Sequence, residues 1–312
     1  MPWKEGYTIS DEVGQQEVQW PEGRQCAVTI VVDCSVVAGV EGITEEDMAK
    51  HEAQFGAGPG MQRVFGLLDA YEFKATFAMP AVIAETFPEA TNEIVQRGHE
   101  VAAHGLRHEE VTNLDRKEEL ARIRRAGEIL ADVTGQKPVG WYSLPRQGDR
   151  YPGGQISPHT VDLLIEEGYA YLGNSMADDI PHYWVTDFAS RRILLAMPYY
   201  YHFDDLFFLM FPAPGGGTGL ENPETLFNNW VQEFDAVYRL GRQFSVVVHP
   251  YLIGWGHRAD VLEETFRHVR GFPEVWNPTA AECARYWEEQ YPAAATLKLE
   301  DSIWRDYPGS MS

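Results

Sequence analysis

The chain has 312 residues, of which 44% are hydrophobic, and its formal net charge is −22. A chain of this length can bury a large core, so it can form one sizeable α/β domain. The excess of acidic residues argues against nucleic acid or an anionic membrane surface as a partner, because both require clustered Lys and Arg. The composition therefore indicates a compact protein that binds neither nucleic acid nor membranes.

The cysteines and the N-terminal segment indicate the compartment. Cys26, Cys34 and Cys283 are too few and too scattered to form a disulfide framework. Residues 1–16 are polar and lack the apolar segment that a signal peptide requires. We therefore expect a cytoplasmic protein, with residues 1–25 as an N-terminal extension and residues 26–312 as a single domain.

Strand and helix patterns alternate along the chain. Apolar runs bounded by turn residues predict strands at 26–33, 74–80, 99–105, 138–147, 170–176, 191–205 and 244–254. Helical spacing of apolar residues predicts helices at 61–71, 85–98, 115–135, 157–169 and 221–241. This alternation favours a parallel α/β barrel of about seven strands.

Polar residues stand where several of the predicted strands end. Asp33, His104, Arg146, the pair Asp204 and Asp205, and His249 all occupy such positions. The catalytic residues of parallel α/β barrels gather at the carboxyl ends of the strands. The sequence therefore predicts an active site at this face.

Two of these positions suggest a metal ion. His104 and His108 are four residues apart, so a helical turn at 105–109 would point both imidazoles the same way, where they could share an ion, most plausibly zinc. Asp33 follows the apolar residues of a buried strand, and a carboxylate there destabilises the fold unless it is paired, hydrogen-bonded or catalytic. We expect these three residues to meet.

Five segments carry a resemblance to a known family: VVDCSVVAG, GHEVAAHGLRH, LADVTGQKPVGW, MPYYYHFDD and VVVHP. From about residue 26 to 290 the chain resembles the polysaccharide deacetylase superfamily, which has the NodB homology domain. It is most similar to the intracellular branch, which includes peptidoglycan deacetylases, allantoinase-like enzymes and cyclic imide hydrolases. The resemblance implies a distorted (β/α)7-8 barrel.

The resemblance also implies residue roles. Asp33 matches the family's catalytic base, His104 and His108 its metal ligands, and His249 its catalytic acid. The family's second aspartate is absent, since Cys34 and Ser35 occupy its two alternative places. Either Asp33 completes the metal site and gives up its role as base, or the site works without metal. Cys34 is expected in the core, because its side chain points opposite to that of Asp33 on a strand.

Further residues are candidates for substrate binding. We expect Arg146 either to hold an acidic group of the substrate or to orient Asp33, and Trp141 and Tyr201 to line the pocket. The Gly-rich segments 39–60 and 211–219 have the length of loops that fold over a barrel mouth.

The function predicted from these residues is hydrolysis of a carbon-nitrogen bond other than a peptide bond, in a small cyclic amide, imide or ureide. One alternative is N-deacetylation of an amino sugar or a peptidoglycan fragment. Another is an inactive barrel that only binds a ligand. The expected partners are a small-molecule substrate and further copies of the chain, in a dimer or a tetramer.

Overall fold

The computed structural model describes residues 7–11, 13, 17–146, 149, 154–209 and 222–301. Its main sheet contains seven strands in parallel pairs, in the order β9-β2-β3-β4-β5-β6-β8. These strands are β2 (Cys26–Asp33), β3 (Thr76–Met79), β4 (Glu100–Ala103), β5 (Gly140–Trp141), β6 (Tyr171–Ser175), β8 (Arg192–Pro198) and β9 (Gln243–Val248).

An isolated β-bridge links the two ends of this parallel series. Asp204, which follows β8, forms an isolated parallel bridge with Val247 of β9. The sheet thus curls into a distorted barrel, which confirms the fold class predicted from the sequence. Two more strands extend it: β7 (His182–Asp187) pairs antiparallel with β8, and β10 (Val275–Trp276) pairs with the start of β2.

Strand β2 is the centre of the sheet and lies where the sequence predicted it. Its eight residues, CAVTIVVD, are all buried, as expected for a run rich in β-branched residues in a parallel sheet. Residues 27–32 pair with β9, whereas residues 31–33 pair with β3 on the other side. Asp33 therefore lies at the carboxyl end of the most enclosed strand.

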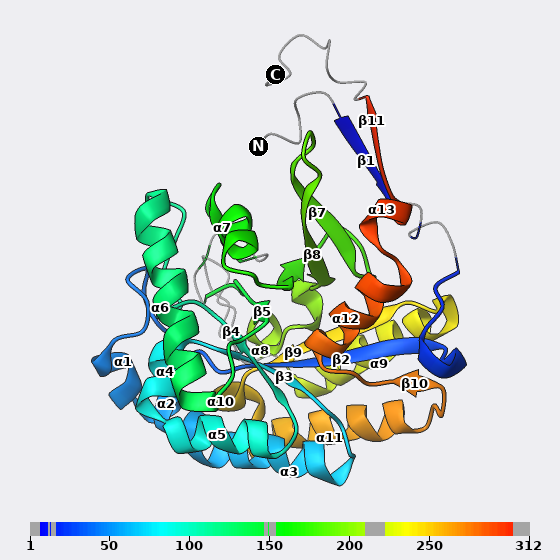
Figure 1. Ribbon diagram of the computed structural model, residues 1–312. Helices are drawn as coiled ribbons and strands as arrows, with labels where there is room; N and C mark the ends of the chain where they lie inside the picture. Colours follow the sequence, from blue (N-terminus) through cyan, green and yellow to red (C-terminus); the bar gives the residue numbers. More distant parts are fainter. Residues whose placement is uncertain are drawn as a thin grey trace.

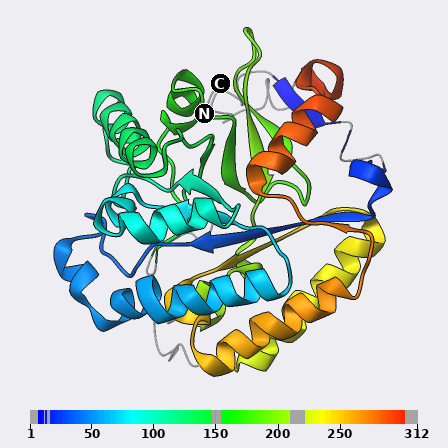
Figure 2. The same cartoon turned by 60° about the horizontal axis from the view of Figure 1, so that its bottom comes forward.

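Helices cover the outside of the barrel (Figures 1 and 2). The longer ones are α3 (Met61–Ala70), α5 (Pro88–Gln96), α6 (Arg116–Thr134), α9 (Pro223–Leu240), α11 (Gly256–Arg270) and α12 (Ala280–Gln290). The shorter ones are α1 (Glu45–Ala49), α2 (His51–Phe55), α4 (Ala81–Thr86), α7 (Thr160–Glu166), α8 (Asp205–Leu209), α10 (Pro250–Ile253) and α13 (Ala293–Thr296). Single turns are η3 (Pro21–Gly23), η4 (Gly56–Gly60) and η5 (Tyr201–Phe203).

The signals at the helix ends explain the boundaries. At α6 the Asp115 side chain accepts a hydrogen bond from the backbone N–H of Glu118, and Gly135 ends the helix with φ 75°. The predicted helix 85–98 is divided into α4 and α5, because Pro88 cannot continue a helix that begins before it. No helix in the described part of the chain is both long and apolar enough to cross a membrane.

Several predicted elements need correction. The strands predicted at 191–205 and 244–254 end earlier, with β8 at Pro198 and β9 at Val248, and the helical elements η5, α8 and α10 follow them. The predicted loop 39–60 is largely helical, since α1, α2 and η4 occupy residues 45–60, and a capping box between Thr44 and Asp47 begins α1. Only Gly140–Trp141 of the predicted strand 138–147 is a strand. The predicted loop 211–219 lies outside the described residues.

The first and the last strand of the described residues pair with each other. Strand β1 (Tyr7–Asp11) pairs antiparallel with β11 (Leu297–Asp301), and Figure 1 shows this pair projecting away from the barrel. Trp20 packs against the rings of Trp276 and Trp287. Part of the predicted extension thus belongs to the packed structure.

The packing between β5 and β6 generates a stability prediction. A Cβ atom at Gly140 would lie 2.0 Å from the ring of Tyr171, whose hydroxyl is held by Glu100. We expect Gly140→Ala to lower the free energy of unfolding by about 1–3 kcal/mol, the usual effect of overpacking. Urea denaturation measures this.

The matched control is Gly66→Ala in α3, where nothing lies within 4 Å of the added Cβ atom. Because Ala favours a helix over Gly, this variant should be more stable by up to about 1 kcal/mol. Equal denaturation midpoints for Gly140→Ala and the parent protein would contradict the packing described here.

Candidate active site

Asp33 lies at the centre of a group of buried polar side chains. Its Oδ1 accepts a hydrogen bond of 2.7 Å from the backbone N–H of Ser35. Its Oδ2 lies 3.2 Å from Nε2 of His249 and 3.5 Å from Nε2 of His104. Neither contact of Oδ2 has hydrogen-bond geometry, so this oxygen stays available to accept a proton or to bind an ion.

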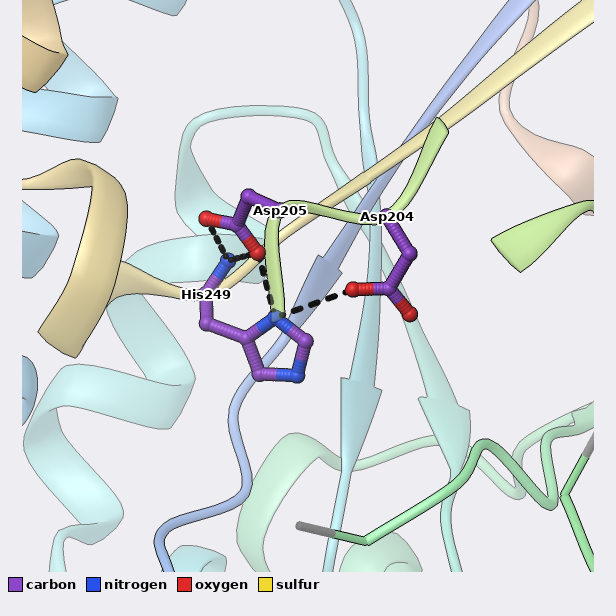
Figure 3. Close-up of side chains that lie close together, drawn as sticks. All are labelled: Asp204, Asp205 and His249. Atoms are coloured by element: carbon purple, nitrogen blue, oxygen red, sulfur yellow. Dashed lines mark hydrogen bonds and ion pairs between the residues drawn. The ribbon is translucent and has the colours of Figure 1, made fainter. Parts of the chain in front are cut away.

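His249 follows β9 directly and is held from one side by Asp205. Its Nδ1 lies 2.6 Å from Oδ1 of Asp205, and its backbone N–H donates to both carboxylate oxygens of that residue. Figure 3 shows Nδ1 facing Asp204 and Asp205, while Nε2 points away from both. The contact between Nδ1 and Asp205 fixes the ring and directs Nε2 towards Asp33.

The charges within this group reinforce one another. Burial opposes the anionic form of Asp33, but His104 and His249 outweigh it and hold the pKa of the carboxyl group well below its usual range. Burial likewise opposes the cationic form of His249, but Asp33 and Asp205 raise the pKa of its imidazole well above its usual range. The imidazole of His249 thus lies between two acidic side chains, although burial raises the pKa of Asp205 above its usual range despite the contact with His249.

Asp204 is a second carboxyl group near His249. Its Oδ1 lies 3.7 Å from Nδ1 of His249 and accepts a hydrogen bond from the backbone N–H of Leu206. The hydroxyl of Tyr199 donates to Oδ2 of Asp204. Burial raises the pKa of Asp204 to about 7, so this group holds its proton more tightly than an ordinary aspartic acid.

The rings of His104 and His108 converge as predicted, with centroids 4.0 Å apart. The predicted cause is wrong, because residues 105–109 do not form a helical turn. Gly105 and His108 instead adopt φ values of 76° and 56°, and such a left-handed residue other than Gly is uncommon. The strained backbone brings the His108 ring beside His104.

Backbone carbonyls orient both rings. Nδ1 of His104 lies 3.0 Å from the carbonyl oxygen of Tyr142, and Nε2 of His108 lies 2.9 Å from that of Leu144. Each of these nitrogens is therefore the N–H donor, which leaves a lone pair on Nε2 of His104 and on Nδ1 of His108. Burial, reinforced by His104, lowers the pKa of His108 to about 3 and keeps its ring neutral.

The donor chemistry of these residues fits a divalent cation. Nε2 of His104, Nδ1 of His108 and Oδ2 of Asp33 are all buried and have no hydrogen-bond partner. Metal-binding histidines are commonly fixed in this way, by a carbonyl that accepts the other ring N–H. Neutral imidazole nitrogens with a carboxylate oxygen are a ligand set that zinc accepts.

A second group of side chains also lies close enough together to hold a metal ion. Among the described residues, only Asp204, Asp205 and His249 bring three ligand atoms within 4.8 Å of one another, so this buried group could also hold a metal ion. Its atoms are already engaged, because both carboxylates accept hydrogen bonds and Nδ1 of His249 is bonded to Asp205. A cation there would have to break the contact that orients His249.

Arg146 is buried and lies among acidic side chains. Its Nη2 contacts Glu110 at 2.7 Å and Asp149 at 2.9 Å, and its Nε also donates to Asp149. The predicted alternative that Arg146 orients Asp33 is not seen, since no contact between the two occurs among the described residues. Arg146 lines one pocket with His104, His108 and Trp141.

The remaining sequence candidates are Trp141, Tyr201 and Cys34. Trp141 is buried on the wall of that pocket, and its ring N–H donates to the hydroxyl of Ser143. Tyr201 is half-buried in η5, where it contacts Tyr200, His202 and Phe207. Cys34 is a core residue as predicted, and burial with the neighbouring Asp33 raises the pKa of its thiol well above the usual range.

Three partners of the candidate residues were not predicted from the sequence. Asp205 was noted only as a strand-tip residue, although its Oδ1 lies 2.6 Å from Nδ1 of His249. Glu110 and Asp149, which bind Arg146, lie on the loops that follow the predicted strands 99–105 and 138–147. A signal for Asp205 existed, since a carboxylate after a strand and a histidine after another strand of the same sheet can meet.

The two candidate cation sites can be distinguished by metal content. We expect His104→Ala and His108→Ala each to lower the stoichiometry of bound zinc sharply, because each removes an available nitrogen. Asp204→Asn should retain the zinc. Mass spectrometry of metal in protein reconstituted with zinc and dialysed measures this.

Asp33→Asn adds a separate result to that experiment. Loss of zinc in this variant would make Asp33 a ligand, whereas retention would leave its carboxylate free to act as a base. Zinc lost from Asp204→Asn and retained in His104→Ala would contradict the assignment and favour the second group.

Comparison with known proteins agrees with this geometry. Residues 53–172 match the family model for polysaccharide deacetylase. The chain is 28% identical over 256 residues to the peptidoglycan deacetylase of Helicobacter pylori, a match that covers 73% of this chain and 84% of that protein. It is 25% identical to the peptidoglycan deacetylase-like protein FGM2 of Gibberella zeae, covering 88% of this chain and 90% of that protein.

Solved structures show the same fold. A Mycobacterium smegmatis protein named for the polysaccharide deacetylase family superposes with a TM-score of 0.77 and 28% identity, covering 88% of this chain and 94% of that one. PuuE allantoinase superposes over the same shares of the two chains with a TM-score of 0.74 and 22% identity. Residues 53–172 therefore match the polysaccharide deacetylase family, as the motifs of the chain predicted, and the chain is a hydrolase of carbon-nitrogen bonds.

Proposed function

We propose that this enzyme hydrolyses a carbon-nitrogen bond in a small cyclic amide, imide or ureide. The observation that carries the proposal is the burial of the reacting side chains, since Asp33, His104 and His249 are all no more than 1% exposed. A long glycan needs an open groove, whereas a compact ring can be enclosed by these side chains. Enclosure also excludes water and strengthens the electrostatic contacts within the site.

In the proposed reaction, Asp33 is the general base. Its carboxylate is anionic, and Oδ2 has no hydrogen-bond donor. It takes a proton from a water molecule as the water oxygen bonds to the substrate carbonyl carbon. Oδ2 is the one free oxygen of Asp33, so it cannot bind a cation while it accepts this proton.

His249 completes the reaction as the general acid. The protonated imidazole donates its Nε2 proton to the ring nitrogen as the carbon-nitrogen bond breaks, which opens the ring. Asp205 stabilises the cation and holds the ring through Nδ1. The contact of 3.2 Å between Nε2 and Oδ2 of Asp33 places the acid and the base beside the same substrate atoms.

The proposal includes a divalent cation, with zinc the first choice, held by His104 and His108. When bound there, such an ion supplies Lewis acidity to the scissile carbonyl. The backbone carbonyls that orient both rings, and the low pKa that keeps the His108 ring neutral, support this assignment. The family's alternative without metal differs only in this stabilisation, because Asp33 and His249 transfer the protons in both.

N-deacetylation of an amino sugar or a peptidoglycan fragment is the second candidate. It is favoured by the similarity to the Helicobacter pylori peptidoglycan deacetylase, and the same base and acid would serve it. The acyclic amide of an acetylated amino sugar is cleaved by the same two proton transfers as a ring amide. Burial of the site is the feature that ranks the small ring first.

Substitution of the two proton-transfer groups tests the proposal. We expect Asp33→Asn and His249→Gln each to lower kcat for the opening of glutarimide or hydantoin by about 10²–10⁴-fold, because each removes one step of acid-base catalysis. The rate of ring opening measures this, and far-ultraviolet circular dichroism checks the fold.

The matched control is Arg124→Glu. Arg124 lies on the outer face of α6, is 57% exposed and pairs with Glu167, so kcat should not change. Efficient release of acetate from chitin oligomers or peptidoglycan by the parent protein, without opening of any cyclic amide, would overturn the ring substrate and establish the deacetylase.

A further inference from the structure

We propose that Arg146 binds a second carbonyl oxygen of the substrate, so that the enzyme selects rings with two carbonyl groups, such as imides and cyclic ureides. This inference rests on the proposed function and narrows its substrate class. It starts from the guanidinium group of Arg146, which is 5% exposed and only partly paired.

Three donor positions of this guanidinium can be compared. Nε donates to Asp149, and Nη2 donates to both Glu110 and Asp149. Nη1 is buried and has no hydrogen-bond partner among the described residues. A buried N–H group without an acceptor is costly and rare in folded proteins, so its persistence requires an explanation.

The surroundings of Arg146 supply that explanation. Arg146 lines the pocket that also contains His104 and His108, so a molecule there contacts the guanidinium and the proposed cation ligands together. The chain itself links them, since the carbonyl of Leu144, two residues before Arg146, orients the His108 ring. The two carboxylates hold the guanidinium in one orientation. This leaves Nη1 available to donate a hydrogen bond to a ligand.

The local charge determines which acceptor is favoured. Two carboxylates, Glu110 and Asp149, already face one guanidinium. A substrate carboxylate beside Arg146 would add a negative charge next to these two carboxylates, so the predicted role of Arg146 in holding an acidic group is disfavoured. A neutral carbonyl oxygen accepts from Nη1 without that penalty.

A ring with two carbonyl groups matches this arrangement. One carbonyl is attacked beside Asp33 and His249, and the other accepts from Arg146. The second contact is made in the substrate complex and in the transition state alike, so its loss should raise KM more than it lowers kcat.

Arg146→Lys tests the inference, because lysine keeps the charge and loses the planar donor group. Two ligands are compared: glutarimide, through its KM, and 2-piperidone, the lactam with the same ring size and one carbonyl, through its inhibition constant. We expect the KM of glutarimide to rise about 10–100-fold, as for a lost hydrogen bond to a charged group, and the inhibition constant of 2-piperidone to change less than about twofold.

Arg124→Lys is the matched control, since Arg124 is exposed on the outer face of α6, does not line this pocket and pairs with Glu167. It should change neither constant. Thermal unfolding monitors both variants, and Arg146→Gln replaces Arg146→Lys in the comparison if the lysine variant does not fold.

The outcomes separate this inference from the function on which it rests. A parent enzyme that opens no imide and releases acetate from amino sugars overturns the proposed function, and the inference with it. A parent enzyme that opens glutarimide, combined with a variant that changes the two constants equally or leaves both unchanged, overturns the role of Arg146 alone.

Discussion

The site depends on one electrostatic arrangement, the protonated imidazole of His249 between the carboxylates of Asp33 and Asp205. Each of these groups alone would be expensive to bury, because a charge loses its hydration in the protein interior. Together they form an alternating series in which each charge favours the next. Removal of one member would leave a buried charge without its partner, which is far more destabilising than loss of an exposed ion pair. Acid-base chemistry and the stability of the barrel mouth therefore depend on the same contacts.

The barrel explains how residues from distant parts of the sequence form this series. Asp33 ends β2, His249 follows the neighbouring strand β9, and Asp205 follows the bridge between Asp204 and Val247. Parallel pairing places all three at the same end of the sheet. The bridge that closes the barrel thus also positions the carboxylates that hold the His249 imidazole.

Much of this could be predicted from the sequence. Apolar β-branched runs identified the core strands, and the capping residues Asp115 and Gly135 identified the ends of α6. Strand-tip positions and the motifs shared with the polysaccharide deacetylase family identified Asp33, His104, His108 and His249. The positions of these residues at strand ends could be predicted because strand ends and helix caps are local signals, whereas their roles belong to the proposed function.

What depends on tertiary contacts could not be predicted in this way. The left-handed backbone of His108 is not the conformation that its sequence spacing suggests, because the carbonyl of Leu144 and the neighbouring loop fix the ring. The partners of Arg146 lie on separate loops, so no periodic pattern joins them. The capping box of Thr279 and Glu282 marks the start of α12, a helix that was not predicted from the sequence.

The central claim is that His249 carries the proton for the leaving nitrogen, and its ring can be observed directly. Because Asp33 and Asp205 raise the pKa of His249, the imidazole should stay cationic below that raised value and lose its proton only as the pH rises through it. Nitrogen-15 NMR of ring-labelled protein, assigned with His249→Gln, should show both ring nitrogens protonated at neutral pH. In Asp205→Asn the deprotonation should move to lower pH. A His249 ring that is neutral at pH 7 in the parent protein would contradict the account.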